Sequence, residues 1–152
     1  SYPLTDGDEE ETLFNMVNAM LLRIHQSGHL VNLSSARFAL VKEGIACYKS
    51  IRQDIRRAVP FWPLGLSSYG DSWVSLGLKA GNKNYIAVWR SDSGNDTCLL
   101  PISHLRGKDA SVKCLYPQNA ACRCAWHKES GELAVELPVN ISARLFEVSA
   151  NE

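Results

Sequence analysis

Two histidines four residues apart, His25 and His29, form the first pair in the chain whose spacing could bind a metal. Zinc proteases use His-Glu-x-x-His on one intact helix, where both imidazoles share a face and the glutamate serves as the base. Here that glutamate is missing, and Gly28 is expected to end the helix. His104 and His127 are isolated along the chain, and we expect them at the surface. We therefore predict no metal ligands and no cofactor.

Carboxylates are the second set of groups that could do chemistry. A glycosidase needs two of them, held rigidly and facing each other. A run of acids from Asp8 to Glu11 is typical of a helix start rather than of a catalytic pair. Further acids are expected in turns or at strand edges: Asp71, Asp92, Asp96, Asp109 and Glu129. No opposed pair stands out, and neither a Gly-x-Ser-x-Gly elbow nor a glycine-rich phosphate loop is present, so we predict no catalytic residue.

Thiols are the third set: Cys47, Cys98, Cys114, Cys122 and Cys124. Their odd number, in a chain rich in apolar residues, favours free thiols in a reducing compartment over a disulfide framework. Cys122 and Cys124 form C-x-C rather than C-x-x-C, and in a strand both lie on one face, beside Trp126. We favour buried, inert thiols here over a redox or metal role.

Two helices are expected to come first. Asp8 and Glu11 are spaced as a capping pair, and Ser27-Gly28 provides the stop of the first helix. Its apolar residues recur at helical spacing: Leu13, Met16, Val17, Met20, Leu21 and Ile24. The second helix is predicted from Ser34 or Ser35 to about Arg57, with Gly44 permitting close packing. Its predicted buried line is Phe38, Val41, Ile45, Tyr48, Ile51 and Ile55. Its predicted outward residues are Arg37, Lys42, Glu43, Lys49, Gln53 and Arg56.

The stretch Pro60–Leu66 separates helical from strand periodicity. Its two prolines stop the preceding helix and cannot join a central strand. Its other residues are apolar, and we expect them to pack between two layers.

Beyond residue 71 the apolar period changes to two, which predicts strands. The first two form a hairpin around a turn at Gly81–Asn84. The expected strands are 73–80, 85–90, 97–102, 111–116, 121–127, 133–137 and 142–148. Short strands at this spacing indicate an antiparallel sandwich.

Composition restricts the function classes. The 152 residues are 45% hydrophobic and 21% charged, with a formal net charge of zero, which indicates a globular chain and no nucleic-acid partner. No apolar run approaches the roughly 20 residues of a membrane span, and the N-terminus has no signal-peptide layout, so we expect no membrane partner and a cytoplasmic location. The start at Ser1, without Met, is expected to be a cut within a longer sequence. Glycosylation triplets at Asn32, Asn95 and Asn140 would matter only in a secreted protein.

Five stretches share their order and spacing with one known family: Met16–Leu30, Leu40–Arg52, Pro60–Leu66, Trp73–Leu78 and Ile86–Arg90. In these stretches the chain resembles the C-terminal part of the alpha-galactosidases of glycoside hydrolase family 36. The resemblance implies an α+β chain. Residues 1–59 would be the last helices of a (β/α)8 barrel, which this chain alone leaves incomplete, and residues 60–152 an antiparallel Greek-key β-sandwich.

The family's enzymes hydrolyse terminal alpha-linked galactose with retention, using one aspartate as nucleophile and another as acid/base. No residue of this chain matches either motif, so the resemblance implies an inactive segment with a structural or oligomerisation role. Its partners would be the rest of the barrel and, through the parent enzyme alone, the alpha-galactoside. Family members are often tetramers, and we expect self-association through the apolar helix faces: Leu13, Met16, Met20, Phe38 and Ile45.

Two other function classes stay open. A free-standing carbohydrate-binding sandwich would need exposed tryptophans, and core packing is favoured for Trp62, Trp73 and Trp89. The solvent exposure of Trp73, Trp89 and Trp126 distinguishes this alternative from a structural segment. A small interaction protein, whose apolar helices bind a partner, is the third class.

Overall fold

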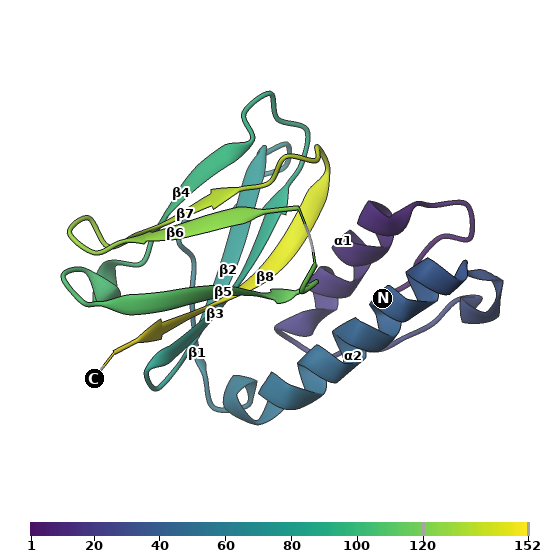
Figure 1. Cartoon of the computed structure of the whole chain (residues 1–152), viewed down its shortest axis with the longest axis horizontal. Coiled ribbons are helices and arrows are strands. Elements are labelled where there is room, and N and C mark those ends of the chain that lie inside the picture. Colours follow the sequence, from purple (N-terminus) through teal and green to yellow (C-terminus); the bar gives the residue numbers. More distant parts are fainter. Residues whose placement is uncertain (120, 152) are drawn as a thin grey trace.

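Two helices, a five-stranded sheet and a three-stranded sheet lie in three successive layers (Figure 1). The computed structural model describes residues 1–119 and 121–151. The helices are α1 (Glu9–Met20) and α2 (Ser35–Ile55), and both pack on the face of the larger sheet that points away from the smaller one. Two short 3-10 helices, η1 (Leu30–Asn32) and η2 (Ser103–Leu105), lie in connecting segments.

All strand pairings are antiparallel. The strands are β1 (Val59–Phe61), β2 (Trp73–Ala80), β3 (Lys83–Arg90), β4 (Thr97–Pro101), β5 (Ala110–Tyr116), β6 (Arg123–His127), β7 (Glu132–Glu136) and β8 (Ser142–Ala150). One sheet has the order β1-β2-β3-β8-β5 and the other β4-β7-β6. The last strand of the chain thus lies between β3 and β5, so distant segments are joined in one sheet. The expected α+β fold with an antiparallel sandwich is confirmed.

The start of α1 follows the expected capping pair, since the Asp8 carboxylate accepts from the Glu11 N–H at 2.8 Å. Its end does not follow the prediction, because the helix stops at Met20 rather than at Ser27-Gly28. The reason is a competing backbone partner. The Ser27 N–H donates to the Ser1 carbonyl at 3.1 Å, which holds this segment against the N-terminal residues instead of in a helical turn.

The second helix begins as predicted, with the Ser34 hydroxyl accepting from the Arg37 N–H at 3.3 Å. The predicted close packing at Gly44 is also present: a Cβ there would lie 2.8 Å from the Met16 methyl carbon. The predicted outward orientation of Arg37 is wrong. This side chain is buried, and its guanidinium binds the Thr12 hydroxyl at 2.7 Å and the Glu11 carboxylate at 2.9 Å.

Phe38 was expected to be buried, and it is 41% exposed. The reason is the place of α2 at the outside of the molecule. Only a narrow stripe of this helix, centred on Val41, Gly44 and Ile51, faces α1 and the sheet.

Apolar side chains form two cores, one on each side of the five-stranded sheet. The first lies between the helices and the sheet, and joins Met16 and Met20 of α1 to Leu145 of β8. The second lies between the two sheets and includes Phe146 of β8 with Leu133 and Val135 of β7. Neighbouring residues of β8 therefore point into different cores, as strand alternation requires.

Three of the five residues expected to mediate self-association are buried within the chain, while Phe38 is 41% exposed. Leu13, Met16 and Met20 are at most 4% exposed, because they are packed into the first core of their own chain. The sheet covers the apolar stripe of α1, so this stripe is closed to a second copy. The division at residues 59 and 60 stays a prediction.

The stretch Pro60–Leu66 also differs from its prediction. Pro60 lies in β1, an edge strand, as proline in a sheet should. Phe61 packs against the second core, but Trp62 is 47% exposed, and Leu64 and Leu66 are exposed as well. The segment thus leaves the sheet at Phe61 and runs over the surface, so it does not pack between layers.

Candidate functional site

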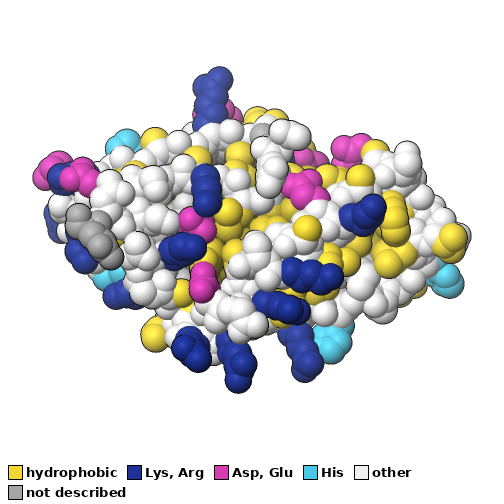
Figure 2. Space-filling view, turned by 60° about the horizontal axis from the view of Figure 1, so that its bottom comes forward, with side chains coloured by type: hydrophobic (Ala, Val, Ile, Leu, Met, Phe, Trp, Pro, Cys, Tyr) yellow, Lys and Arg dark blue, Asp and Glu magenta, His cyan; other side chains and the backbone are white. Residues whose placement is uncertain are grey.

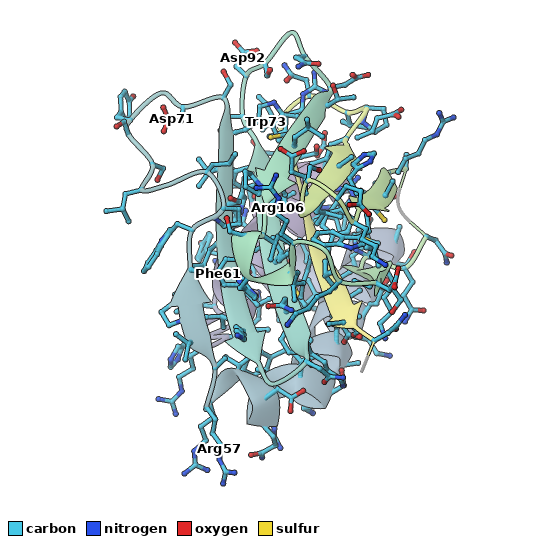
Figure 3. All side chains as sticks on the ribbon, turned by 90° about the vertical axis from the view of Figure 1, so that its left-hand side faces the viewer. Arg57, Phe61, Asp71, Trp73, Asp92 and Arg106 are labelled. Carbon is cyan, nitrogen blue, oxygen red and sulfur yellow. The ribbon has the colours of Figure 1, made fainter. Side chains whose placement is uncertain are left out.

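An apolar hollow of about 940 Å3 lies on the three-stranded sheet. Cys98 of β4, Cys124 of β6 and Val135 of β7 lie side by side across this sheet and line the cavity together. Trp73 of β2 also lines it, near the upper end of the sandwich in Figure 3. The polar lining contains one cation and one anion, Arg123 and Glu136, whose charged groups are 3.8 Å apart. The cavity is therefore apolar, with a neutral charge balance.

A sugar-binding module would need exposed tryptophans, but Trp73, Trp89 and Trp126 are all partly buried. Trp89 packs on the helical core, while Trp73 and Trp126 pack on the core between the sheets. The Trp126 indole donates to the Lys108 carbonyl at 2.9 Å. These three rings form no exposed platform. The exposed aromatic rings nearby are Trp62 and Tyr69, on the segment between β1 and β2.

The acids near the N-terminus hold the fold together. Asp8 caps α1, and Glu11 binds the buried Arg37. Glu10 accepts two hydrogen bonds of 2.7 Å each from Arg144 of β8. The role of this run as a helix start is confirmed for Asp8. The partners of Glu10 and Glu11, both arginines, were not predicted, because nothing in the local sequence points to residues so distant.

The acids of the turns make local bonds. The Asp71 carboxylate accepts from the Ser68 N–H at 2.7 Å, and Asp92 accepts from the Asn140 amide at 3.0 Å. Figure 3 shows both side chains on loops at the Trp73 end of the sandwich. Asp109 forms an exposed ion pair with Lys128 at 2.7 Å. These bonds order loops, and they bring no two carboxylates together.

The histidines are scattered. His25 and His29 are exposed and lie beyond the end of α1, so they do not share a helix face. Within residues 1–119 and 121–151, no three potential metal ligands form a group. His127 is exposed as expected, whereas the surface position expected for His104 is wrong. Its ring is half-buried, contacting Phe61 edge-on at 5.0 Å between centroids and the Asn84 amide oxygen at 2.7 Å.

Burial lowers the pKa of His104, and the positive charges of Lys79 and Lys108 lower it further. Asn84 donates its amide N–H to the Val148 carbonyl at 3.3 Å, so its oxygen is the acceptor and His104 Nε2 bears the proton. The imidazole therefore joins η2 to β1 and β3 in surroundings that disfavour its charged form.

The five cysteines are free and partly buried. Cys122 and Cys124 both pack on the core between the sheets with Trp126, as the C-x-C spacing predicted. Cys114 of β5 packs on the same core, and its sulfur lies 3.6 Å from the Tyr116 carbonyl oxygen and 3.4 Å from that of Pro117.

Apolar side chains remain exposed on the helical side of the molecule. Figure 2, which brings the side of α2 forward, shows apolar groups gathered across this face, with Lys and Arg side chains along its lower edge. The large exposed residues of the first 40 positions are Tyr2, Leu4, Leu22, Val31 and Phe38. In the part of the chain that the structure describes, no helix is long and apolar enough to cross a membrane.

Comparison with solved structures relates this arrangement to a group of glycosidases. The alpha-galactosidase AgaA of Geobacillus stearothermophilus, from family 36, superposes with a TM-score of 0.67 at 14% identity, over 90% of this chain and 19% of its own. A Bacillus halodurans protein, whose proposed activity is that of an alpha-N-acetylgalactosaminidase, gives 0.65 at 12% identity, over 96% and 33%. The galactosidase domain of the alpha-galactosidase–sucrose kinase AgaSK gives 0.61 at 14% identity, over 90% and 19%.

The fold is that of the C-terminal region of family 36 alpha-galactosidases. The fold that the sequence resemblance implied is thus confirmed. The chain spans between 19% and 33% of the length of these three structures. No protein-family model matches the sequence, and no curated protein sequence matches it.

Proposed function

We propose that this chain is a C-terminal segment of an alpha-galactosidase of family 36, with a structural or oligomerisation role and no hydrolytic activity of its own. Its fold agrees with that of AgaA over 90% of its length, and its sequence resembles the same family in five ordered stretches. The acids of the turns are occupied in loop and surface bonds, which supports an inactive segment.

The main support for the proposal is that the helical layer is packed on its inner side and exposes apolar side chains on its outer side. The inner side of α1 is fully packed on the sheet, as the zero exposure of Met16 and Met20 records. The outer side of this layer exposes Phe38 of α2 with Leu22 and Val31 of the segment between the helices. In a barrel enzyme, helices pack against strands and neighbouring helices. We therefore assign the exposed apolar side chains of this layer to contact with the rest of the barrel.

Two measurements test the proposal. The coding sequence upstream of Ser1 is expected to encode a barrel with two catalytic aspartates, and a stop codon directly before Ser1 would contradict it. The purified chain is expected to leave a chromogenic alpha-galactoside intact. Activity that copurifies with the chain through several columns, and that is lost on substitution of one of its carboxylates, would show a catalytic site and overturn the inactive role.

A second candidate, a sugar-binding sandwich, is favoured by the cavity beside Trp73. Its neutral charge balance suits a neutral ligand, and Arg123 and Glu136 could bind hydroxyl groups as donor and acceptor. Titration with raffinose would test it through tryptophan fluorescence of the wild-type protein and of Arg123→Ala. A saturable change lost in Arg123→Ala supports this candidate, and no change at millimolar raffinose rejects it.

A further inference from the structure

Three polar side chains of the five-stranded sheet lie together on the face that points toward the smaller sheet. Trp73 and Ser75 are two residues apart on β2, and Arg90 of β3 is the direct pairing partner of Trp73. Residues two apart in a strand share a face, and directly paired residues of adjacent strands lie about 5 Å apart. Trp73 packs on the core between the sheets, so all three side chains face that core. They form the sandwich-end cluster.

Each member of the sandwich-end cluster has a buried polar atom without a hydrogen-bond partner among the described residues. These atoms are Nε1 of Trp73, the hydroxyl of Ser75 and Nε of Arg90. Ser75 is 2% exposed and Arg90 is 5% exposed. A buried donor that has lost its contact with water and gained no acceptor destabilises the fold, so native proteins rarely leave one unpaired. Three of them on one face of two paired strands indicate a site for an acceptor.

The charge of Arg90 indicates what kind of acceptor this is. Its two terminal nitrogens donate to the carbonyl oxygens of Leu137 and Ser93, which fix the guanidinium in place. None of the ion pairs within residues 1–119 and 121–151 includes Arg90. A buried cation is costly without a counter-charge. The acceptor that suits the cluster is therefore an anion.

The cluster adjoins the apolar hollow on the three-stranded sheet. Trp73 belongs to both, because its side chain also lines the hollow. Arg90 contacts the same region from behind, since its acceptor Leu137 directly follows Glu136, another lining residue. The volume of about 940 Å3 lies in the range of small-molecule sites, which are typically apolar with a few placed polar groups. A ligand with an apolar body in the hollow can thus direct a polar head to the cluster.

We propose that the hollow and the sandwich-end cluster together bind an amphipathic monocarboxylate. Its apolar body lies beside Cys98 and Val135, which line the hollow. Its carboxylate accepts hydrogen bonds from the three cluster donors. A carboxylate fits this place because its two oxygens only accept, and because its single negative charge balances one guanidinium.

The rim of the hollow does not provide a competing cation. Arg123 is paired with Glu136 at 3.8 Å, and its side chain is 85% exposed. The sugar-binding candidate uses these two rim groups, whereas the monocarboxylate uses the donors of the cluster. The inference does not rest on the structural role proposed above, so either one can fail without the other.

Entry of the carboxylate requires the Trp73 indole to turn. The three donor atoms are covered by protein in the free chain. Trp73 is only partly buried, and the hollow beside its ring leaves space for such a rotation. Its indole N–H gains an acceptor on binding, so this one proton reports the event directly.

Octanoate is the probe for the first test, and the readout is the indole N–H signals of the ¹⁵N-labelled full chain. The four tryptophans give four such signals, and Trp73→Phe identifies the one that belongs to Trp73. This signal is expected to move downfield and saturate as octanoate is added. 1-Octanol has the same chain without the charge, and we expect it to bind about tenfold more weakly. An unmoved Trp73 signal at millimolar octanoate, or equal affinity for 1-octanol, would overturn the proposal.

Two variants locate the carboxylate, each first shown by circular dichroism to be folded. Ser75→Ala and Trp73→Phe each remove one donor and keep most of the side-chain volume. Each is expected to weaken octanoate binding about threefold or more in isothermal titration calorimetry, because one hydrogen bond to the carboxylate is lost. Arg123→Ala is the matched control at the rim and should retain the wild-type affinity. Wild-type binding by both donor variants, or loss of binding in Arg123→Ala, would place the carboxylate elsewhere and contradict the assignment.

Discussion

Arg144 and Glu10 form a bidentate ion pair, with two hydrogen bonds of 2.7 Å between β8 and α1. The arginine side chain is 1% exposed and that of Glu10 is 22% exposed, so the pair is largely removed from water. It joins the first helix to the last strand, across the core that the helices share with the sheet.

The Glu10 carboxylate should be required for stability. Glu10→Ala leaves the buried guanidinium without its counter-charge, and we expect a loss of about 3 kcal/mol in the free energy of unfolding. Glu9→Ala in the same helical turn is the matched control, because Glu9 is exposed, and its effect should stay within about 0.5 kcal/mol. Urea denaturation measures both. Equal effects of the two substitutions would show that the pair contributes nothing specific.

Replacing Gly77 by a larger residue should destabilise the fold. It lies opposite Phe61 in the pairing of β1 with β2, and the Phe61 ring occupies the space that a Cβ at Gly77 would need. Gly77→Ala must displace this ring from His104, and we expect a cost of about 1–3 kcal/mol. Gly94→Ala is the control, since nothing lies within 4 Å of its Cβ position. Thermal unfolding compares the two, and similar melting temperatures would show that the ring moves freely.

Stability should depend on pH through His104. Its folded-state pKa is below the value of about 6.5 in an unfolded chain, because burial and two lysines oppose its positive charge. The folded protein thus binds fewer protons between these two values. Its contribution is fully present above about pH 6.5 and is lost as the pH falls toward the folded pKa. Unfolding midpoints at several pH values should show a steeper acid loss for wild type than for His104→Gln. His127→Gln should follow the wild type, and a parallel profile for His104→Gln would exclude this role.

Hydrogen exchange tests the division at residues 59 and 60. The side chains of β8 are almost all buried, whereas α2 buries only a narrow stripe that includes Val41 and Ile51. We expect the slowest amides in β3 and β8 and faster exchange in α2. The rates should not change with protein concentration, because Met16 and Met20 are covered within the chain. Equal protection of α2 and β8 would show one cooperative unit.

Local sequence patterns predicted the helices and strands better than they predicted which distant residues contact them. The hairpin of β2 and β3 follows from alternating residues around a glycine turn, and the α1 start follows from Asp8 and Glu11, since both depend on residues close in sequence. The end of α1 depends on Ser1, and the burial of Arg37 depends on Thr12, which periodicity within one helix does not contain.

The same limit applies to the candidate sites. Cys122 and Cys124 form a motif in the sequence, yet Cys114, on a strand of the other sheet, packs on the same core as both of them. The exposure of Trp62 was also missed, because an apolar segment in sequence does not reveal whether its own chain covers it. The five-stretch resemblance did predict the fold, since it compares the order and spacing of stretches from Met16 to Arg90 rather than one local pattern.

The short strand β1 affects whether a strand of another chain can pair with the edge of the five-stranded sheet. Outermost strands have unpaired N–H and C=O groups that can template a further strand from another chain. At this edge the strand has three residues, and its central residue, Pro60, has no N–H to donate. Continuous cross-β extension from this side of the sheet is therefore disfavoured. Any partner that approaches here must be recognised by side chains, such as the indole of Trp62, rather than by main-chain pairing.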